Sequence, residues 1–258
     1  MASSLRALLC GKATKTLSPA APGPASALRT SLEHIGSTLD AFLRELAWLR
    51  GASDTRVTLF GPYVGRSILE LGTTALVGRL DAFRLLGLRA HQMQSEYELG
   101  KRHRIAFQWQ GDVCQAEKTQ ELWPDTDFSK IPRALVGPHY GNAIWAPAFE
   151  RMIDETAELE GGEWLAELRQ WTADAFLPRL RSEIERAYSS LSKGIHHEFV
   201  VPPGVTYDRI TVARDINASV KAAATLGLVC NFVDHAPDRT GPSRAATLFE
   251  QIQRKELF

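Results

Sequence analysis

The chain has 258 residues, of which 44% are hydrophobic and 23% charged, the balance of a soluble globular protein with enough apolar residues for a sizeable core. Thirty basic and thirty acidic side chains cancel, which excludes binding of nucleic acid or anionic membrane through net charge. The three cysteines indicate neither a disulfide framework nor a cysteine zinc site, and they favour a reducing, cytoplasmic compartment. No apolar run reaches the roughly 18 to 20 residues of a membrane span.

The first two segments differ sharply in character. Residues 1–24 contain basic but no acidic side chains and end in a proline-rich stretch, which predicts a flexible arm or a segment bound by a partner. Residues 28–49 place apolar side chains at alternating steps of four and three, the pattern of a long amphipathic helix. This stripe suits a facing helix or a second copy of the chain and comprises Leu28, Leu32, Ile35, Leu39, Phe42, Leu46 and Leu49.

A second long helix is predicted from Tyr63 onward, after a short extended candidate at residues 56–60. Gly65, Gly72 and Gly78 leave part of this helix surface without side chains, and each glycine costs roughly 1 kcal/mol of helix stability relative to alanine. The pattern therefore predicts either close neighbours on that face or a break near residues 79–83.

The composition of the middle of the chain predicts a boundary between two halves. Residues 105–110 alternate bulky side chains with small or polar ones, which is typical of a short strand. Residues 111–138 contain several prolines and predict an irregular connection. It separates an N-terminal half, residues 25–110, from a C-terminal half, residues 139–258, and the two halves could also form one domain.

The C-terminal half predicts further helices. One starts near Pro147, and a longer one covers residues 163–191, with a kink expected near Pro178 because proline removes a helical hydrogen bond. A helix follows at residues 213–233 and is nearly free of charge from Ala222 to Phe232, and a last one, residues 243–257, begins with a serine cap. The predicted fold is an all-α multi-helix bundle with long kinked helices and at most a short extended or two-stranded element.

The polar cluster with the clearest chemical character follows the long helix that ends near Gly194. We expect this glycine to end the helix and to project His196 and His197 towards neighbouring helices or solvent. Histidine acts as acid or base near neutral pH, and Arg186 or Lys193 could neutralise a phosphate. Alternatively, the histidines cap the helix and satisfy buried carbonyls.

The motif Arg186-x-Tyr-x-x-Leu-Ser-Lys-Gly-Ile-His196 resembles the motif region of the HEPN superfamily of helical proteins. The resemblance covers residues 140–236. It implies an all-helical, often dimeric protein, and many members are metal-independent ribonucleases of toxin, antiphage or CRISPR-associated systems. In those families four to six residues separate the arginine from the histidine, whereas nine separate them here. Two other stretches meet the spacing, Arg84 to His91 and Arg133 to His139.

The sequence also contains candidates for two other kinds of site. Lys101, Arg102 and Arg104 form the best basic patch, either a contact for RNA phosphates or a solvated loop. Metal-ligand types occur in two places, but adjacent histidines usually point apart and the paired Glu-x-x-His motif of a di-iron bundle is absent, so no metal or other cofactor is predicted. The ligand-type residues are His196, His197, Glu198, Asp234 and His235.

These patterns support two functional hypotheses. The first is a HEPN-like subunit or effector of a prokaryotic defence or toxin-like system, with metal-independent RNA cleavage by His196 and His197, assisted by Arg186 and Lys193. The second is a noncatalytic interaction protein that binds a protein partner through the stripe of residues 28–49 and the small-residue helix faces. Both predict a homo-oligomer or a heterocomplex, without a membrane.

Overall fold

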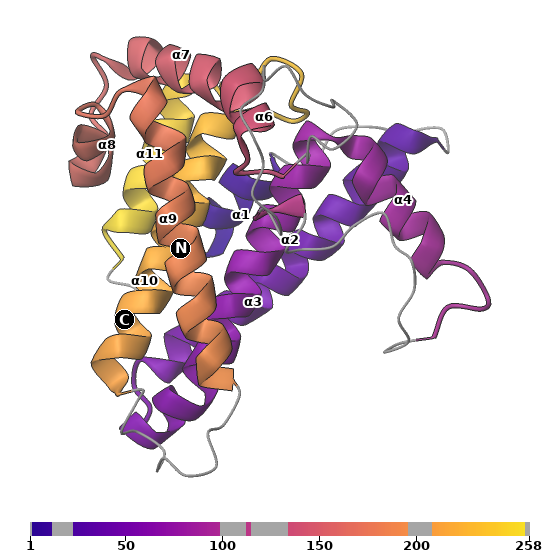
Figure 1. Cartoon of the computed structure of the whole chain (residues 1–258), viewed down its shortest axis with the longest axis vertical. Coiled ribbons are helices and arrows are strands. Elements are labelled where there is room, and N and C mark those ends of the chain that lie inside the picture. Colours follow the sequence, from indigo (N-terminus) through magenta and orange to yellow (C-terminus); the bar gives the residue numbers. More distant parts are fainter. Residues whose placement is uncertain (1, 12–22, 99–111, 115–133, 196–207, 256–258) are drawn as a thin grey trace, which may run out of the picture.

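The computed structural model describes residues 2–11, 23–98, 112–114, 134–195 and 208–255. The regular structure within these ranges is helical and contains no strand, which confirms the predicted all-α class (Figure 1). A short π-helix, η2 (Gly141–Trp145), lies between α6 and α7. The α-helices are α1 (Ala2–Cys10), α2 (Pro24–Leu49), α3 (Asp54–Leu80), α4 (Ala82–Gln92), α6 (Pro138–Tyr140), α7 (Ala146–Thr156), α8 (Gly162–Leu168), α9 (Ala173–Ile195), α10 (Arg209–Cys230) and α11 (Pro242–Gln253).

The long helix predicted at residues 28–49 is α2, and its apolar stripe lies in the core. Leu39, Leu46 and Leu49 are buried, and the helix packs along α3 and α1. The stripe is therefore used within the chain, so it is not the partner-binding surface that the second hypothesis assigned to it.

Helix α3 starts earlier than predicted. The extended candidate at residues 56–60 is wrong, because these residues form the first turns of α3, where Val57 is fully buried. Packing of this turn outweighs the strand propensity of its side chains. The break predicted near residues 79–83 is confirmed, since α3 ends at Leu80 and α4 begins at Ala82.

The N-terminal segment contradicts the predicted arm. Residues 2–10 form α1, which packs on α2, α3, α10 and α11, with Leu5, Leu8 and Leu9 fully buried. A helix of nine residues is marginal in isolation, so burial of these leucines stabilises it. Gly11 ends it in a left-handed conformation, with φ +80°. Residues 12–22 of the predicted arm lie outside the described ranges.

Glycines allow three helices to approach α3 closely, as predicted. A Cβ atom at Gly65 would lie 2.7 Å from the Ile216 side chain of α10 and 3.3 Å from Leu191 of α9, and one at Gly72 would lie 3.1 Å from Leu9 of α1. One continuous core joins residues from both predicted halves. The structure thus packs the two halves together as one helical body.

The C-terminal helices differ from the prediction at their ends. Residues 163–191 do not form one kinked helix, because α8 ends at Leu168 and α9 begins at Ala173 and continues through Pro178. The last helix begins at Pro242 with Gly241 as its N-cap, so Ser243 is not the cap. Among the described helices, none combines the length and the apolar character needed to cross a bilayer.

A buried arginine joins the ends of several helices. Arg79, 2% exposed, donates to the carbonyl of Leu8 at the end of α1 at 2.8 Å and, through Nη2, to the carbonyl of Pro237 at 3.0 Å. Asn231, the C-cap of α10, donates to the Gly227 carbonyl at 2.7 Å. The positive charge therefore lies among helix C-termini, whose carbonyls carry partial negative charge.

Candidate functional site

The described part of the candidate site is the C-terminal end of α9. Gly194 does not end this helix, because α9 continues through Ile195, so the predicted glycine stop is wrong. His196 and His197 follow directly in the sequence and lie outside the described ranges, as do Lys101, Arg102 and Arg104. The geometry available therefore concerns the last turns of α9 and what packs against them.

Arg186 and Lys193 lie on the same face of α9. They are seven residues apart, which is close to two helical turns or about 10 Å along the axis. Both side chains are exposed, and Arg186 Nη2 donates to Ser182 Oγ at 3.5 Å. The structure thus brings the two predicted cations onto one solvent-facing side of the helix.

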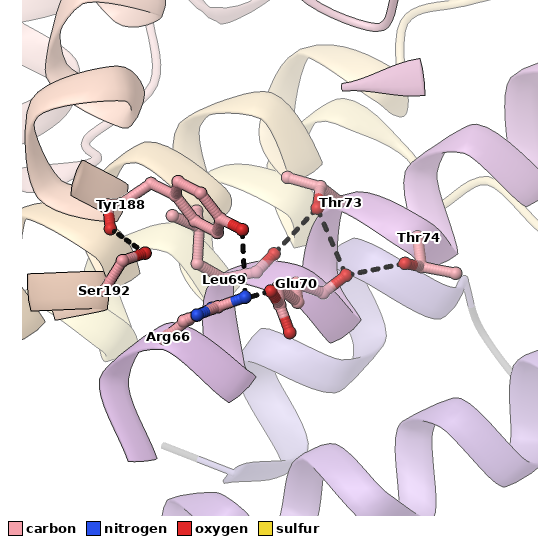
Figure 2. A network of polar contacts seen from close by, with 7 residues as sticks. All are labelled: Arg66, Leu69, Glu70, Thr73, Thr74, Tyr188 and Ser192. Atoms are coloured by element: carbon pink, nitrogen blue, oxygen red, sulfur yellow. Dashed lines mark hydrogen bonds and ion pairs between the residues drawn. The ribbon is translucent and has the colours of Figure 1, made fainter. Parts of the chain in front are cut away.

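A polar network ties the opposite face of α9 to α3 (Figure 2). Arg66 of α3 donates to the Tyr188 hydroxyl at 3.0 Å and to Glu70 Oε1 at 2.8 Å, and its guanidinium lies 4.8 Å from the Tyr188 ring centroid. Ser192 donates to the Tyr188 carbonyl at 2.6 Å. Burial raises the pKa of Tyr188 above 10.0, which keeps the hydroxyl protonated at neutral pH. The network fixes the position of the helix end.

Arg66 is the cation that sequence reasoning missed. Its ion pair with Glu70 at an i, i+4 spacing is visible in the sequence, but such pairs are common on exposed helix faces. Only the packing of α3 on α9 shows that this arginine reaches Tyr188 on the helix that precedes His196.

The side of α10 that faces α9 carries a buried carboxylate. Asp215, 5% exposed, accepts a hydrogen bond from Ser190 Oγ at 2.5 Å and one from Arg214 Nε at 3.3 Å. A buried carboxylate needs such donors, because an unpaired charge is costly away from water. The last turns of α9 are therefore fastened to α10 as well as to α3.

The alternative arginine–histidine pairs gain no support as phosphate sites. The guanidinium of Arg84 lies 2.8 Å from Asp112 Oδ1 and 3.5 Å from Asp81 Oδ2, so two carboxylates already compensate its charge. Arg133 lies outside the described ranges. The Arg84 to His91 stretch is thus part of an ion-pair cluster beside the break between α3 and α4.

An open depression of about 500 Å³ lies beside the connection between α10 and α11. Asp234 at its rim accepts from Arg151 and Arg239, and the hydrogen bond from Arg151 lowers the pKa of Asp234 below 3.8. These charges compensate one another. No group of three or more histidine, cysteine, aspartate or glutamate side chains is placed to hold a metal ion in the part of the chain that is described.

Comparison with protein-family models, with curated proteins and with solved structures gives no match. The fold defines the protein as an all-α bundle, and the proposal for its function rests on the residues described above.

Proposed function

We propose that the protein is a metal-independent endoribonuclease of HEPN-like architecture, acting in the cytoplasm as a subunit or effector of a prokaryotic defence or toxin-like system. One observation carries the proposal. The end of α9, which leads directly into His196 and His197, has cations on two faces, Arg66 on one and Arg186 with Lys193 on the other.

These residue types suit cleavage of an RNA phosphodiester. A neutral imidazole takes the proton of the ribose 2′-hydroxyl, and the 2′-oxygen attacks the adjacent phosphorus while the bond to the 5′-oxygen breaks. A protonated imidazole gives its proton to that leaving oxygen. Arginine and lysine stabilise the additional negative charge on the phosphate in the transition state. All four groups come from this chain, and no metal takes part.

Incubation of the purified protein with RNA in the presence of a chelator tests the proposal. We expect cleavage by the wild-type chain and a loss of at least a hundredfold in the His196→Ala, His197→Ala double variant, because acid–base catalysis contributes about 10² to 10⁴ in rate. Unchanged cleavage by the double variant would remove these histidines from the mechanism.

Arg186→Ala and Lys193→Ala separate the phosphate-binding role from folding. Both side chains are exposed, so their removal should leave stability unchanged while cleavage slows. Glu185→Ala, an exposed substitution on the same helix, is the matched control. For the defence or toxin role, induced expression in a bacterial host should arrest growth with the wild-type chain and not with the double histidine variant.

A second candidate function is a noncatalytic subunit that binds a protein partner, and helix α4 favours it. This helix projects from the bundle (Figure 1) and exposes Phe83 at 77%, while Met93, just past its end, is 69% exposed. An aromatic ring exposed to this extent on a projecting helix offers a place for a protein contact. Mass measurement in solution tests it: a stable complex that Phe83→Ser abolishes supports this function, and a monomer at all concentrations contradicts a homo-oligomer.

A further inference from the structure

The outer face of α3 exposes aromatic side chains between α2 and α9. Trp48 of α2 and Phe60 and Tyr63 of α3 are 53%, 54% and 55% exposed. Burying such rings would be favourable, so a row of them in solvent is an exception to the usual pattern. We name this surface the aromatic–arginine face and define it as Trp48, Arg56, Phe60, Tyr63, Arg66 and Tyr188.

Arginines alternate with the rings along this face. Arg56 lies 5.5 Å from the Trp48 ring centroid, and Arg66 lies 4.8 Å from that of Tyr188. Tyr63, between these two pairs, makes an edge contact with Phe42 of α2, with ring centroids 5.6 Å apart. Contacts with α2 and α9 thus position Tyr63 and Arg66 of α3, while Trp48, Phe60 and Tyr63 stay about half exposed.

The face lies level with the end of α9. Gly65 of α3 lies beside Leu191, and Arg66 contacts Tyr188, so the two helices run antiparallel. One turn back along α3 from Gly65 therefore corresponds to one turn forward along α9 from Leu191, which is Ile195. Figure 1 shows the connection of α2 to α3 and the end of α9 at the same end of the molecule. The exposed rings thus lie beside the helix end that precedes His196.

The local charge is positive. Residues 44–63 contain three arginines and two acidic residues, and one of the latter, Asp54, is paired with Arg209 at 3.2 Å. Glu70 likewise pairs with Arg66. The three arginines of this stretch, Arg44, Arg50 and Arg56, are exposed, and they outnumber its two acidic residues, Glu45 and Asp54. A negatively charged partner therefore fits this surface better than an uncharged, apolar partner.

We propose that the aromatic–arginine face binds single-stranded RNA and leads it to the end of α9. Aromatic rings stack on unpaired bases of any sequence, and arginines contact the phosphates between them. Paired bases are not available for this stacking, so the face selects single strands over duplexes. The assignment of RNA as substrate rests on the proposed function, whereas binding by the face can be measured without cleavage.

Fluorescence anisotropy with a labelled 12-nucleotide oligoadenylate RNA tests the proposal. Measured in the His196→Ala, His197→Ala background, binding should weaken with rising salt and should weaken about tenfold or more on Trp48→Ala plus Phe60→Ala. Trp48→Phe should retain most of the affinity, because the ring remains. Phe83→Ala removes a ring on α4 that is 77% exposed and lies outside the aromatic–arginine face, so it is the control and should bind like its parent.

Each outcome decides between clear alternatives. Absence of RNA binding, unchanged affinity in the double ring variant, or equal affinity for the same strand in a duplex would overturn the proposal. So would loss of a protein complex in that variant with RNA affinity intact, since the face would then be a protein interface. If cleavage persists at the parental rate without the rings, the ribonuclease proposal stands and the role of this face is contradicted. If binding depends on the rings but no cleavage occurs, the role of the face stands and the ribonuclease proposal is contradicted.

Discussion

The docking site of α1 and the aromatic–arginine face use the same residue types in opposite ways. At the first, Leu9 is fully buried and Arg79 donates all its described hydrogen bonds to carbonyl and amide oxygens inside the protein. On the second, Phe60 and Arg56 face solvent. In the first region the polar and apolar groups stabilise the fold, whereas in the second they remain exposed and can contact a partner. Matched substitutions in the two regions test this difference.

Replacement of Arg79 should have the largest effect. Arg79→Met leaves the carbonyls of Leu8 and Pro237 buried without this donor, and we expect a loss of about 3 to 5 kcal/mol in the free energy of unfolding. Arg56→Met, the matched change on the exposed face, should cost less than about 1 kcal/mol. Urea unfolding measures both, and equal losses would contradict the contrast.

Shortening a leucine of α1 should come next. Leu9→Ala removes a buried side chain that packs over Gly72 and Gly227, with an expected loss of about 2 to 5 kcal/mol. Leu59→Ala, on the exposed side of α3, removes the same atoms from a site that is 37% exposed and should cost far less. A flexible arm would give no difference between them, so this pair also tests the placement of α1.

Glu183 lies between the two extremes, because it is half-buried on α9. Burial raises its pKa above 4.5, so the folded state binds more protons than the unfolded state at pH values between the two pKa values. Stability should therefore fall as pH rises through that window. We expect Glu183→Gln to be more stable than the wild type at pH 7, by less than about 1 kcal/mol, and equally stable at pH 4. The same difference at both pH values would rule out this titration.

We expect Phe60→Ser to have the smallest effect on stability. Since the ring is largely exposed, the free energy of unfolding should change by no more than about 0.5 kcal/mol. The same variant should lose affinity for single-stranded RNA. A large loss of stability would show that the ring serves the fold, and Trp48→Ala would then replace Phe60→Ser in the binding measurement.

Much of the fold could be predicted from periodicity, and the failures have physical causes. The stripe of residues 28–49 and the helix near residues 213–233 could be predicted because the spacing of their apolar residues alone defines a buried face. Helix α1 was missed because three leucines in nine residues are a weak signal beside the prolines that follow. Its stability comes from contacts with α10 and α11, more than 200 residues away in sequence.

The candidate site could be predicted only in part. The helix that carries Arg186 and Lys193 was predicted, and the structure shows both side chains exposed on it. Arg66 and the row of Trp48, Phe60 and Tyr63 could not be assigned, because the sequence does not say that α3 lies between α2 and α9. Their exposure is a property of the packing and not of any local pattern.

The position of α1 also has a consequence for biosynthesis. Residues 2–10 leave the ribosome well before residues 209–253, yet α10 and α11 form part of the surface on which they rest. The leucines of this helix can therefore reach α2 and α3 early, but they gain their full set of contacts only after residues 209–253 have been synthesised.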